Sequence, residues 1–252
     1  MIMLKNAHII TCESEEIEKG YIIIEETHIK EVGKMENVPL FSGEEIDLGG
    51  KYIMPGMIDA HTHLGMWGYA GTKESRDLNE SSSPITPHLR AIDGINPLDE
   101  YFSEALMGGV TTVCTGPGSA NPIAGTFAVI KTKGNCVDDM AIKKEAAMKF
   151  SFGENPKSCH SDAIKTRMGT AAIIREALFK AREYDGSSFD MKSHALKSVT
   201  DGKMLVKAHA HRADDIFTAL RIADEFNLKI SIEHCTEGHL ICDKLKNVKM
   251  QK

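Results

Sequence analysis

The pattern of apolar and polar positions changes near Ile53. Before it, short apolar or alternating runs at 20–24 and 27–32 lie between glycines, which is typical of short strands and turns. After it, apolar runs of strand length alternate with segments whose apolar residues recur at helical spacing. The sequence therefore predicts a small β-rich module over 1–52 and a larger α/β domain over 53–252.

The larger domain is expected to alternate strands with helices. The expected strands are 53–63, 110–115, 127–131, 147–152, 203–208 and 229–233, and the expected helices are 99–107, 169–184, 214–226 and a last one over 238–245. This alternation predicts a mostly parallel sheet, and the apolar first strand is expected to be buried. Histidines and charged residues recur at the strand ends, which form the active-site face of a (β/α) barrel.

Two segments, 64–98 and 185–201, are rich in Gly, Ser, Pro and charged residues. They are expected to be long, mobile loops on the surface. The alternative for both segments is a cover over a site, and the first segment directly follows a pair of histidines.

Composition places the chain among ordinary globular proteins. Its 252 residues are 42% hydrophobic and 26% charged, which argues against a disordered chain. The 30 basic and 36 acidic residues give a net charge of −6. The chain has no excess of basic residues, so binding to nucleic acid is not expected. No apolar run approaches the roughly 20 residues of a membrane span, so a membrane location is not expected either. The N-terminus lacks a signal-peptide pattern and the six cysteines lack paired spacing, so a cytoplasmic location is expected.

Three expected strand ends carry histidines. His61 and His63 end the run Pro-Gly-Met-Ile-Asp-Ala-His-Thr-His, His209 and His211 lie in Lys-Ala-His-Ala-His-Arg, and His234 lies in Ile-Glu-His-Cys. Because side chains alternate along a strand, the two members of each pair point to the same side. One histidine at a strand end is often only a hydrogen-bonded polar group. Three such ends around one cavity instead favour a site for a divalent metal.

The run Pro-Gly-Met-Ile-Asp-Ala-His-Thr-His resembles the amidohydrolase superfamily, whose members are metal-dependent hydrolases on a (β/α) barrel. The later His-Ala-His-Arg-Ala-Asp-Asp and Ile-Glu-His segments resemble that family's fifth and sixth strands. Within the family the chain most resembles the imidazolonepropionase-related branch, which includes prolidase-type peptidases. The resemblance runs from about residue 45 to the C-terminus, and the residues before it resemble the N-terminal part of an accessory β-sandwich.

The resemblance implies a TIM-type barrel that holds one or two divalent ions, with zinc favoured over manganese, iron or nickel. The implied histidine ligands are His61, His63, His209 and His234. In the family a fourth-strand residue, either a carboxylated lysine or a glutamate, bridges two metals. Lys149 is the first candidate for this role and Glu154 the second.

Three further residues are candidates for contact with substrate. His211 is the expected catalytic residue, as a group that contacts substrate or supports a ligand. Arg167 and Arg212 are weaker candidates for binding a substrate carboxylate, which suits the bidentate guanidinium. The alternative for both arginines is a solvated surface position.

The implied function is hydrolysis of a carbon–nitrogen bond in a small-molecule substrate by a metal-activated water. Cyclic amides and peptide-like substrates are both open, deamination is a third option, and homo-oligomerisation is left open by analogy with related barrels.

Only 18 residues follow His234, too few for two more βα units. The barrel is therefore expected to be incomplete, with about six of eight strands. It would lack the eighth-strand aspartate that binds metal and transfers the proton in the family. The alternative function is a catalytically inactive remnant, or one part of a split hydrolase, that retains a metal site.

Overall fold

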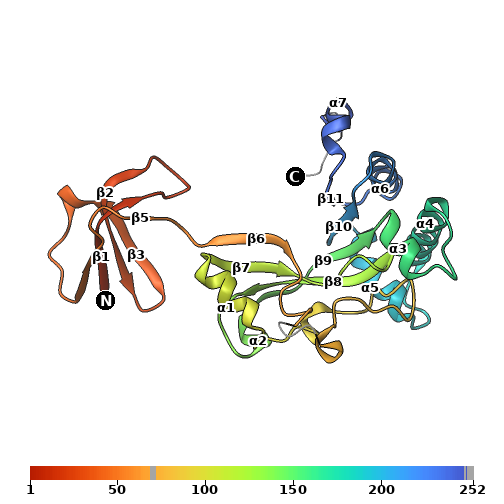
Figure 1. The fold of residues 1–252 in the computed structure, drawn as a ribbon, viewed down its shortest axis with the longest axis horizontal. Coiled ribbons are helices and arrows are strands. Elements are labelled where there is room, and N and C mark those ends of the chain that lie inside the picture. Colours follow the sequence, from red (N-terminus) through yellow and green to blue (C-terminus); the bar gives the residue numbers. More distant parts are fainter. Residues whose placement is uncertain (69–71, 247, 249–252) are drawn as a thin grey trace. The chain divides into compact units, whose positions relative to one another are not determined.

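A computed structural model describes residues 1–68, 72–246 and 248 and divides the chain into two compact units, Met1–Met57 and Ile58–Lys252 (Figure 1). Each unit has its own sheet and its own hydrophobic clusters. Among the described residues, every helix is too short or too polar to cross a membrane.

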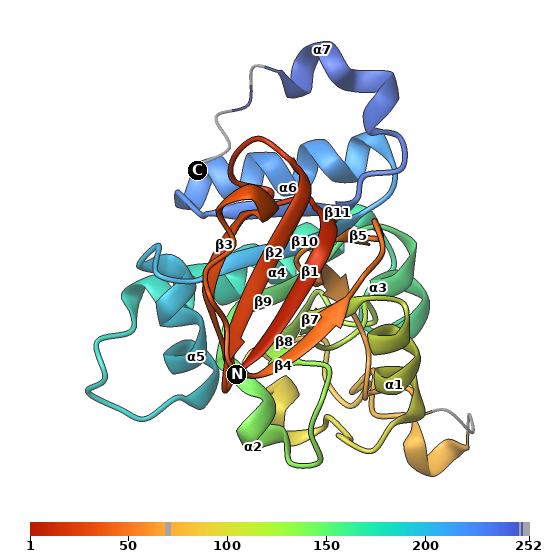
Figure 2. The same ribbon diagram turned by 90° about the vertical axis from the view of Figure 1, so that its left-hand side faces the viewer.

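The first unit is built on a five-stranded sheet in the order β3-β2-β1-β4, with β5 also pairing with β1 (Figure 2). The strands are β1 (Ile2–Ile9), β2 (Ile17–Glu25), β3 (His28–Lys34), β4 (Glu44–Asp47) and β5 (Tyr52–Ile53), and a short turn of 3-10 helix, η1 (Met35–Asn37), follows β3. Neighbouring side chains on a strand point to opposite faces. Ile22 accordingly packs with Ile9, whereas Ile23 packs with Met3 and Tyr21.

The second unit contains a six-stranded sheet in the order β11-β10-β9-β8-β7-β6. The strands are β6 (Met57–Thr62), β7 (Val110–Thr115), β8 (Ile123–Lys131), β9 (Ala141–Ser151), β10 (Leu205–Ala210) and β11 (Ile230–His234). Strands β9, β10 and β11 are parallel, so their carboxyl ends lie at one edge of the sheet.

The expectation of a mostly parallel sheet is wrong for β8. This strand runs antiparallel to both β7 and β9. The connections on either side of it, 116–122 and 132–140, are shorter than the dozen or more residues that a parallel crossover needs. The chain therefore turns back on itself at both ends of β8.

Seven α-helices and three further 3-10 turns are seen among the described residues of the second unit. They are α1 (Glu100–Met107), α2 (Val137–Met140), α3 (Glu154–Cys159), α4 (Arg167–Glu183), α5 (Met191–Thr200), α6 (Ala213–Phe226), α7 (Cys242–Leu245), η2 (Lys73–Ser75), η3 (Ala91–Asp93) and η4 (Gly238–Ile241). Helix α4 begins where the Thr166 side chain accepts a hydrogen bond from the Gly169 N–H. Helix α6 ends at Asn227, whose φ of 54° is left-handed.

The main core of the second unit lies between the parallel strands and helices α4 and α6. Ile174 and Leu178 of α4 and Ile216 of α6 are fully buried together with Val206 and Ala208 of β10. Full burial of one such aliphatic side chain contributes about 1.5–3 kcal/mol. This packing holds the ends of β10 and β11 in fixed positions.

Three expectations about exposure are wrong. Segment 185–201 is not a loop throughout, because α5 begins after Asp190, whose side chain caps the Lys192 N–H, and buries Leu196. Segment 64–98 is not simply mobile surface, because several of its apolar side chains enter the core; they are Met66, Ala91 and Ile95. The sparse apolar residues of 64–98 form no local period, so only tertiary packing reveals their burial.

The third corrected expectation concerns β6, which was expected to be a buried strand. It lies at the end of the six-stranded sheet, and its Met57 and Ile58 side chains are exposed. An apolar run indicates that a strand can be buried, but the order of strands in the sheet decides whether other elements cover that strand.

Candidate metal centre

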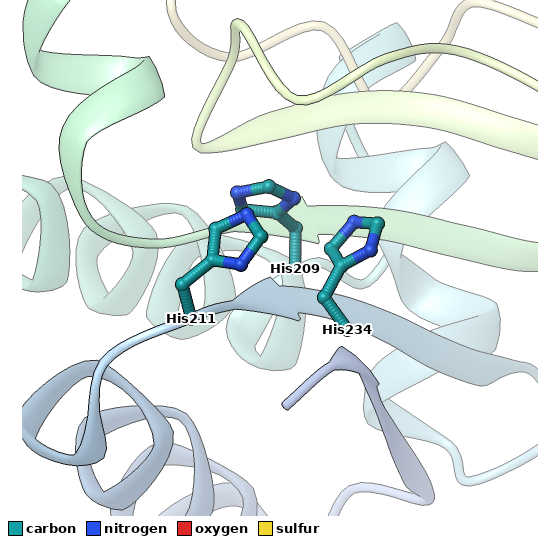
Figure 3. A group of neighbouring side chains, drawn as sticks. All are labelled: His209, His211 and His234. Carbon is teal, nitrogen blue, oxygen red and sulfur yellow. The ribbon is translucent and has the colours of Figure 1, made fainter. Parts of the chain in front are cut away.

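The parallel ends of β10 and β11 bring three histidines together. His209 lies in β10, His211 directly follows it, and His234 ends β11. Each offers a ring nitrogen, and these nitrogens lie within 4.8 Å of one another (Figure 3). The ring centroids of His209 lie 4.6 Å from His211 and 4.7 Å from His234. Alternation along β10 and the parallel pairing with β11 together produce this group.

The histidine pair of β6 lies beside this group. The His61 ring centroid is 5.6 Å from that of His234 and 5.3 Å from that of His63. The His61 ring also stacks on Phe127 of β8. His63 Nδ1 donates a 2.7 Å hydrogen bond to the Gly116 carbonyl at the end of β7, which fixes its ring. The ends of β6, β10 and β11 therefore contribute histidines to one polar cluster.

Lys149 of β9 lies within this cluster, whereas Glu154 does not contact it. The Lys149 side chain is fully buried and its Nζ lies 3.5 Å from His61 Nε2. Glu154, at the start of α3, instead forms ion pairs with Arg167 at 2.5 Å and Lys157 at 3.3 Å. Of the two candidates for the fourth-strand position, Lys149 alone is placed next to a histidine.

Burial keeps the imidazoles of His61 and His209 neutral. It lowers the pKa of His61 and of His209 from 6.5 to about 3, and the nearby Lys149 charge adds to the effect. Burial also lowers the pKa of His63 and His234. The pKa of Lys149 itself falls from 10.5 to about 8, again through burial. Neutral imidazole is the form that binds a metal, so His61 and His209 can accept an ion without first losing a proton.

A second observation, in addition to the neutral imidazoles, indicates that the cluster can hold a divalent ion. The His209 Nδ1 atom is buried without a hydrogen-bond partner among the described residues. Two nitrogens that share one zinc are at most about 4.2 Å apart. The 4.8 Å spread of the three-histidine group therefore closes with side-chain shifts of less than about 1 Å.

The three residues considered for substrate contact have different surroundings. His211 is exposed, and its Nδ1 is hydrogen-bonded to the Thr236 hydroxyl at 2.6 Å. Arg212 binds Asp214 at 2.9 Å, and Arg167 binds the buried Asp215 at 3.0 Å. Among the described residues, neither guanidinium donates a hydrogen bond to a histidine of the cluster. The structure thus places His211 in the cluster and the two arginines in ion pairs.

Sequence reasoning missed the ion pair of Lys207 and Glu233. Lys207 Nζ lies 2.7 Å from Glu233 Oε1, and Glu233 Oε2 lies 3.2 Å from His61 Nδ1. Burial raises the pKa of the Glu233 carboxyl, but hydrogen bonds from Lys207 and Ser231 outweigh it and the net shift is downward. The sequence does contain a signal for Lys207, because residues two apart on a strand share a face and Lys207 lies two residues before His209.

The sequence contains no corresponding signal that Glu233 lies near the histidines. Adjacent residues of a regular strand point to opposite sides, so Glu233 and His234 should have diverged. Instead, His234 has a φ of 69° and Cys235 a φ of 48°, both left-handed. This uncommon backbone ends the alternation and lets the two side chains lie close to the same histidine, His61.

Known proteins resemble this chain over most of its length. No family model matches it. The amidohydrolase tasK of Hapsidospora irregularis is 30% identical over 230 residues, which are 77% of this chain and 23% of the relative. A 5-methylthioadenosine/S-adenosylhomocysteine deaminase of Bacillus cereus is 27% identical over 219 residues, 84% of this chain and 41% of the relative. The chain thus spans between about a quarter and two-fifths of the length of these curated relatives.

A solved structure gives a closer match. The crystal structure of an amidohydrolase from Thermotoga maritima has a TM-score of 0.90 and 39% sequence identity, and the match covers 97% of this chain and 67% of that one.

Proposed function

The chain belongs to the amidohydrolase superfamily, and from this premise we propose that it carries the metal centre of a hydrolase that cleaves a carbon–nitrogen bond in a small-molecule substrate. The observation that supports this proposal most is the convergence of neutral histidines and a buried lysine at the ends of neighbouring strands. The match to the Thermotoga maritima amidohydrolase also supports a partial TIM-type barrel, although β8 of the described six-stranded sheet runs antiparallel to its neighbours.

The proposed ligands come from four strands. They would be His61, His63, His209 and His234, with Lys149 as the further ligand from β9. An ammonium group cannot bind a metal. Lys149 would have to lose a proton and then add carbon dioxide at Nζ, which forms a carbamate and releases a second proton. Its lowered pKa of about 8 makes the required neutral amine accessible. Glu154 is the less favoured alternative, because Arg167 and Lys157 already bind it.

One or two divalent ions held here, with zinc favoured, would supply the Lewis acidity that activates water and polarises the scissile bond. His61 and His209 contribute by staying neutral at pH 7. His211 is exposed beside them and hydrogen-bonded to Thr236, and we propose it as the group that contacts substrate. Its ring nitrogen also lies within 4.8 Å of those of His209 and His234, so the alternative is a role as a third ligand. The ion pairs of Arg167 and Arg212 favour a structural role for both arginines over binding of a substrate carboxylate.

The substrate class is open between two chemistries. The resemblance to the imidazolonepropionase-related branch favours a cyclic amide or a peptide-like bond. The relatives named as deaminases favour a second candidate, removal of an amino group from a purine ring. A metal-binding chain without turnover, by itself or as one part of a split hydrolase, is the alternative to both. We also propose a cytoplasmic location, since scattered thiols are typical of a reducing compartment.

Metal content tests the first part of this proposal. We expect the purified chain to retain zinc or another divalent ion after gel filtration, measured by plasma mass spectrometry. His209→Gln and His234→Gln should each lose most of it. His28→Gln is the matched control, because His28 is an exposed histidine on β3 in the first unit. A wild-type chain that binds no divalent ion would refute the metal centre.

Turnover tests the second part. The metal-loaded chain would be assayed with imidazolones, dihydropyrimidines, Xaa-Pro dipeptides and 5′-methylthioadenosine. Hydrolysis of one class that is lost in His234→Gln would identify the reaction. For that substrate, His211→Gln should raise KM more than it lowers kcat if His211 contacts the substrate. Bound metal without turnover of any class would favour the non-catalytic alternative.

A further inference from the structure

Glu233 of β11 is a buried carboxylate to which the proposed reaction gives no role. Its Oε1 accepts a hydrogen bond from the Ser231 hydroxyl at 2.6 Å and lies 2.7 Å from Lys207 Nζ, while its Oε2 lies 3.2 Å from His61 Nδ1. The side chains of Glu233, Lys207 and His61 are only 12%, 7% and 14% exposed. One oxygen of this carboxylate is thus bound by two donors, and the other is directed at a single imidazole nitrogen.

The two nitrogens of His61 face different partners. Nδ1 faces the Glu233 carboxylate, and Nε2 faces the metal cluster, where Lys149 Nζ lies 3.5 Å away. A neutral imidazole carries its proton on one nitrogen and a lone pair on the other. A carboxylate beside Nδ1 favours the proton there, which leaves the lone pair on Nε2. In metal sites such a partner fixes both the tautomer and the orientation of a histidine ligand.

We propose that Glu233 is the positioning residue for His61 and that, by accepting the Nδ1 proton, it presents the Nε2 lone pair to a divalent ion. The part that concerns the ion rests on the function proposed above, whereas the part that concerns the tautomer does not. Lys207 forms the ion pair that neutralises the Glu233 carboxylate. Its ammonium group neutralises Glu233, so the carboxylate orients the ring instead of binding the ion itself.

The contact is close but not yet aligned. His61 Nδ1 lies 3.2 Å from Glu233 Oε2, which is close enough for an ion pair. The angle at Nδ1 does not meet that of a hydrogen bond, so this buried nitrogen has no hydrogen-bond partner among the described residues. A small rotation of the ring completes the bond. Catalytic hydrogen bonds commonly tighten in this way when the site is filled.

The tautomer of His61 is the first test, and it needs no metal. Long-range ¹H–¹⁵N correlation spectra of the metal-free, histidine-labelled chain at pH 7.5 report which ring nitrogen carries the proton, and loss of one signal set in His61→Gln assigns His61. We expect the proton on Nδ1. A proton on Nε2 in the wild-type chain overturns the proposal, whatever the metal content.

Zinc affinity is the second test, and it uses two matched variants that both remove the buried ion pair. Glu233→Gln with Lys207→Met keeps an acceptor for Nδ1, whereas Glu233→Met with Lys207→Met does not. By chelator competition, the second variant should bind zinc about 10–100-fold more weakly than wild type, and the first should stay close to wild type. Equal affinities in the two variants overturn the proposal.

The outcomes separate this proposal from the proposed function. A wild-type chain that binds no zinc refutes the metal centre, and the tautomer of His61 then still decides the role of Glu233. Circular dichroism checks that both variants fold. If the Met–Met variant does not fold, the wild-type tautomer remains the deciding result.

Discussion

The burial that keeps His209 neutral should make the second unit less stable as the pH falls. His209 is 4% exposed, and its Nδ1 has no hydrogen-bond partner among the described residues. Burial, followed by the charge of Lys149, lowers its pKa from 6.5 to about 3. The substitution His209→Gln removes this titrating group and keeps a polar side chain of similar size.

The sign and size of the effect follow from proton linkage. The folded-state pKa of His209 lies below the unfolded value, so between pH 6.5 and 3 the unfolded chain binds more protons than the folded one. Stability therefore decreases as the pH falls through this window. Between pH 7 and 5, this one histidine should lower the free energy of unfolding by about 2 kcal/mol.

Urea denaturation in the presence of EDTA measures this loss without interference from bound metal. Trp67 is the only tryptophan of the chain and lies in the second unit, so its fluorescence reports on that unit. The wild-type chain should lose about 2 kcal/mol more stability than His209→Gln between pH 7 and 5. His194→Gln, which replaces an exposed histidine on α5, is the control and should behave as wild type. Equal losses in wild type and His209→Gln would show that burial does not hold His209 neutral.

Three further predictions concern stability and use the same assay. Gly153→Ala should lower the free energy of unfolding by about 1–3 kcal/mol, because Gly153 has a φ of 85° and a Cβ there would lie 2.7 Å from Asp215 Oδ2. Gly186→Ala is the control: Gly186 has a similar φ of 81° but a Cβ there would have no atom within 4 Å, so the loss of stability should be smaller. Leu178→Ala removes a fully buried side chain of the main core and should cost about 2–5 kcal/mol, so a change below 1 kcal/mol would contradict the packing described. Asp190→Ala removes the N-cap of α5 and should cost about 1 kcal/mol, with Asp190→Asn close to wild type.

Local pattern was sufficient for most of the elements that carry the site. The apolar runs before His209 and His234 predicted the strands that became β10 and β11, and the spacing of His209 and His211 predicted a shared side. These inferences succeed because they depend on the period of a strand and on the shared direction of parallel strands, which are properties of the backbone alone.

Other features depend on distant parts of the chain. Two short connections turn β8 antiparallel, the position of β6 at the end of the sheet leaves it exposed, and sparse apolar residues of 64–98 are buried by the core. No local period encodes any of these. The different surroundings of Lys149, beside His61, and of Glu154, in an ion pair with Arg167, likewise have no signature in the local sequence.

By itself, the sequence determined that histidines would gather at the ends of neighbouring strands, because that outcome needs only strand periodicity and the resemblance of a few motifs. The tertiary structure alone decided which charges face them. The Glu233 carboxylate reaches His61 because the left-handed backbone at His234 and Cys235 ends the strand alternation, and because Lys207 offsets the cost of burying its charge. Such contacts join residues that are far apart in sequence, so their energies have no signature in any local window of the chain.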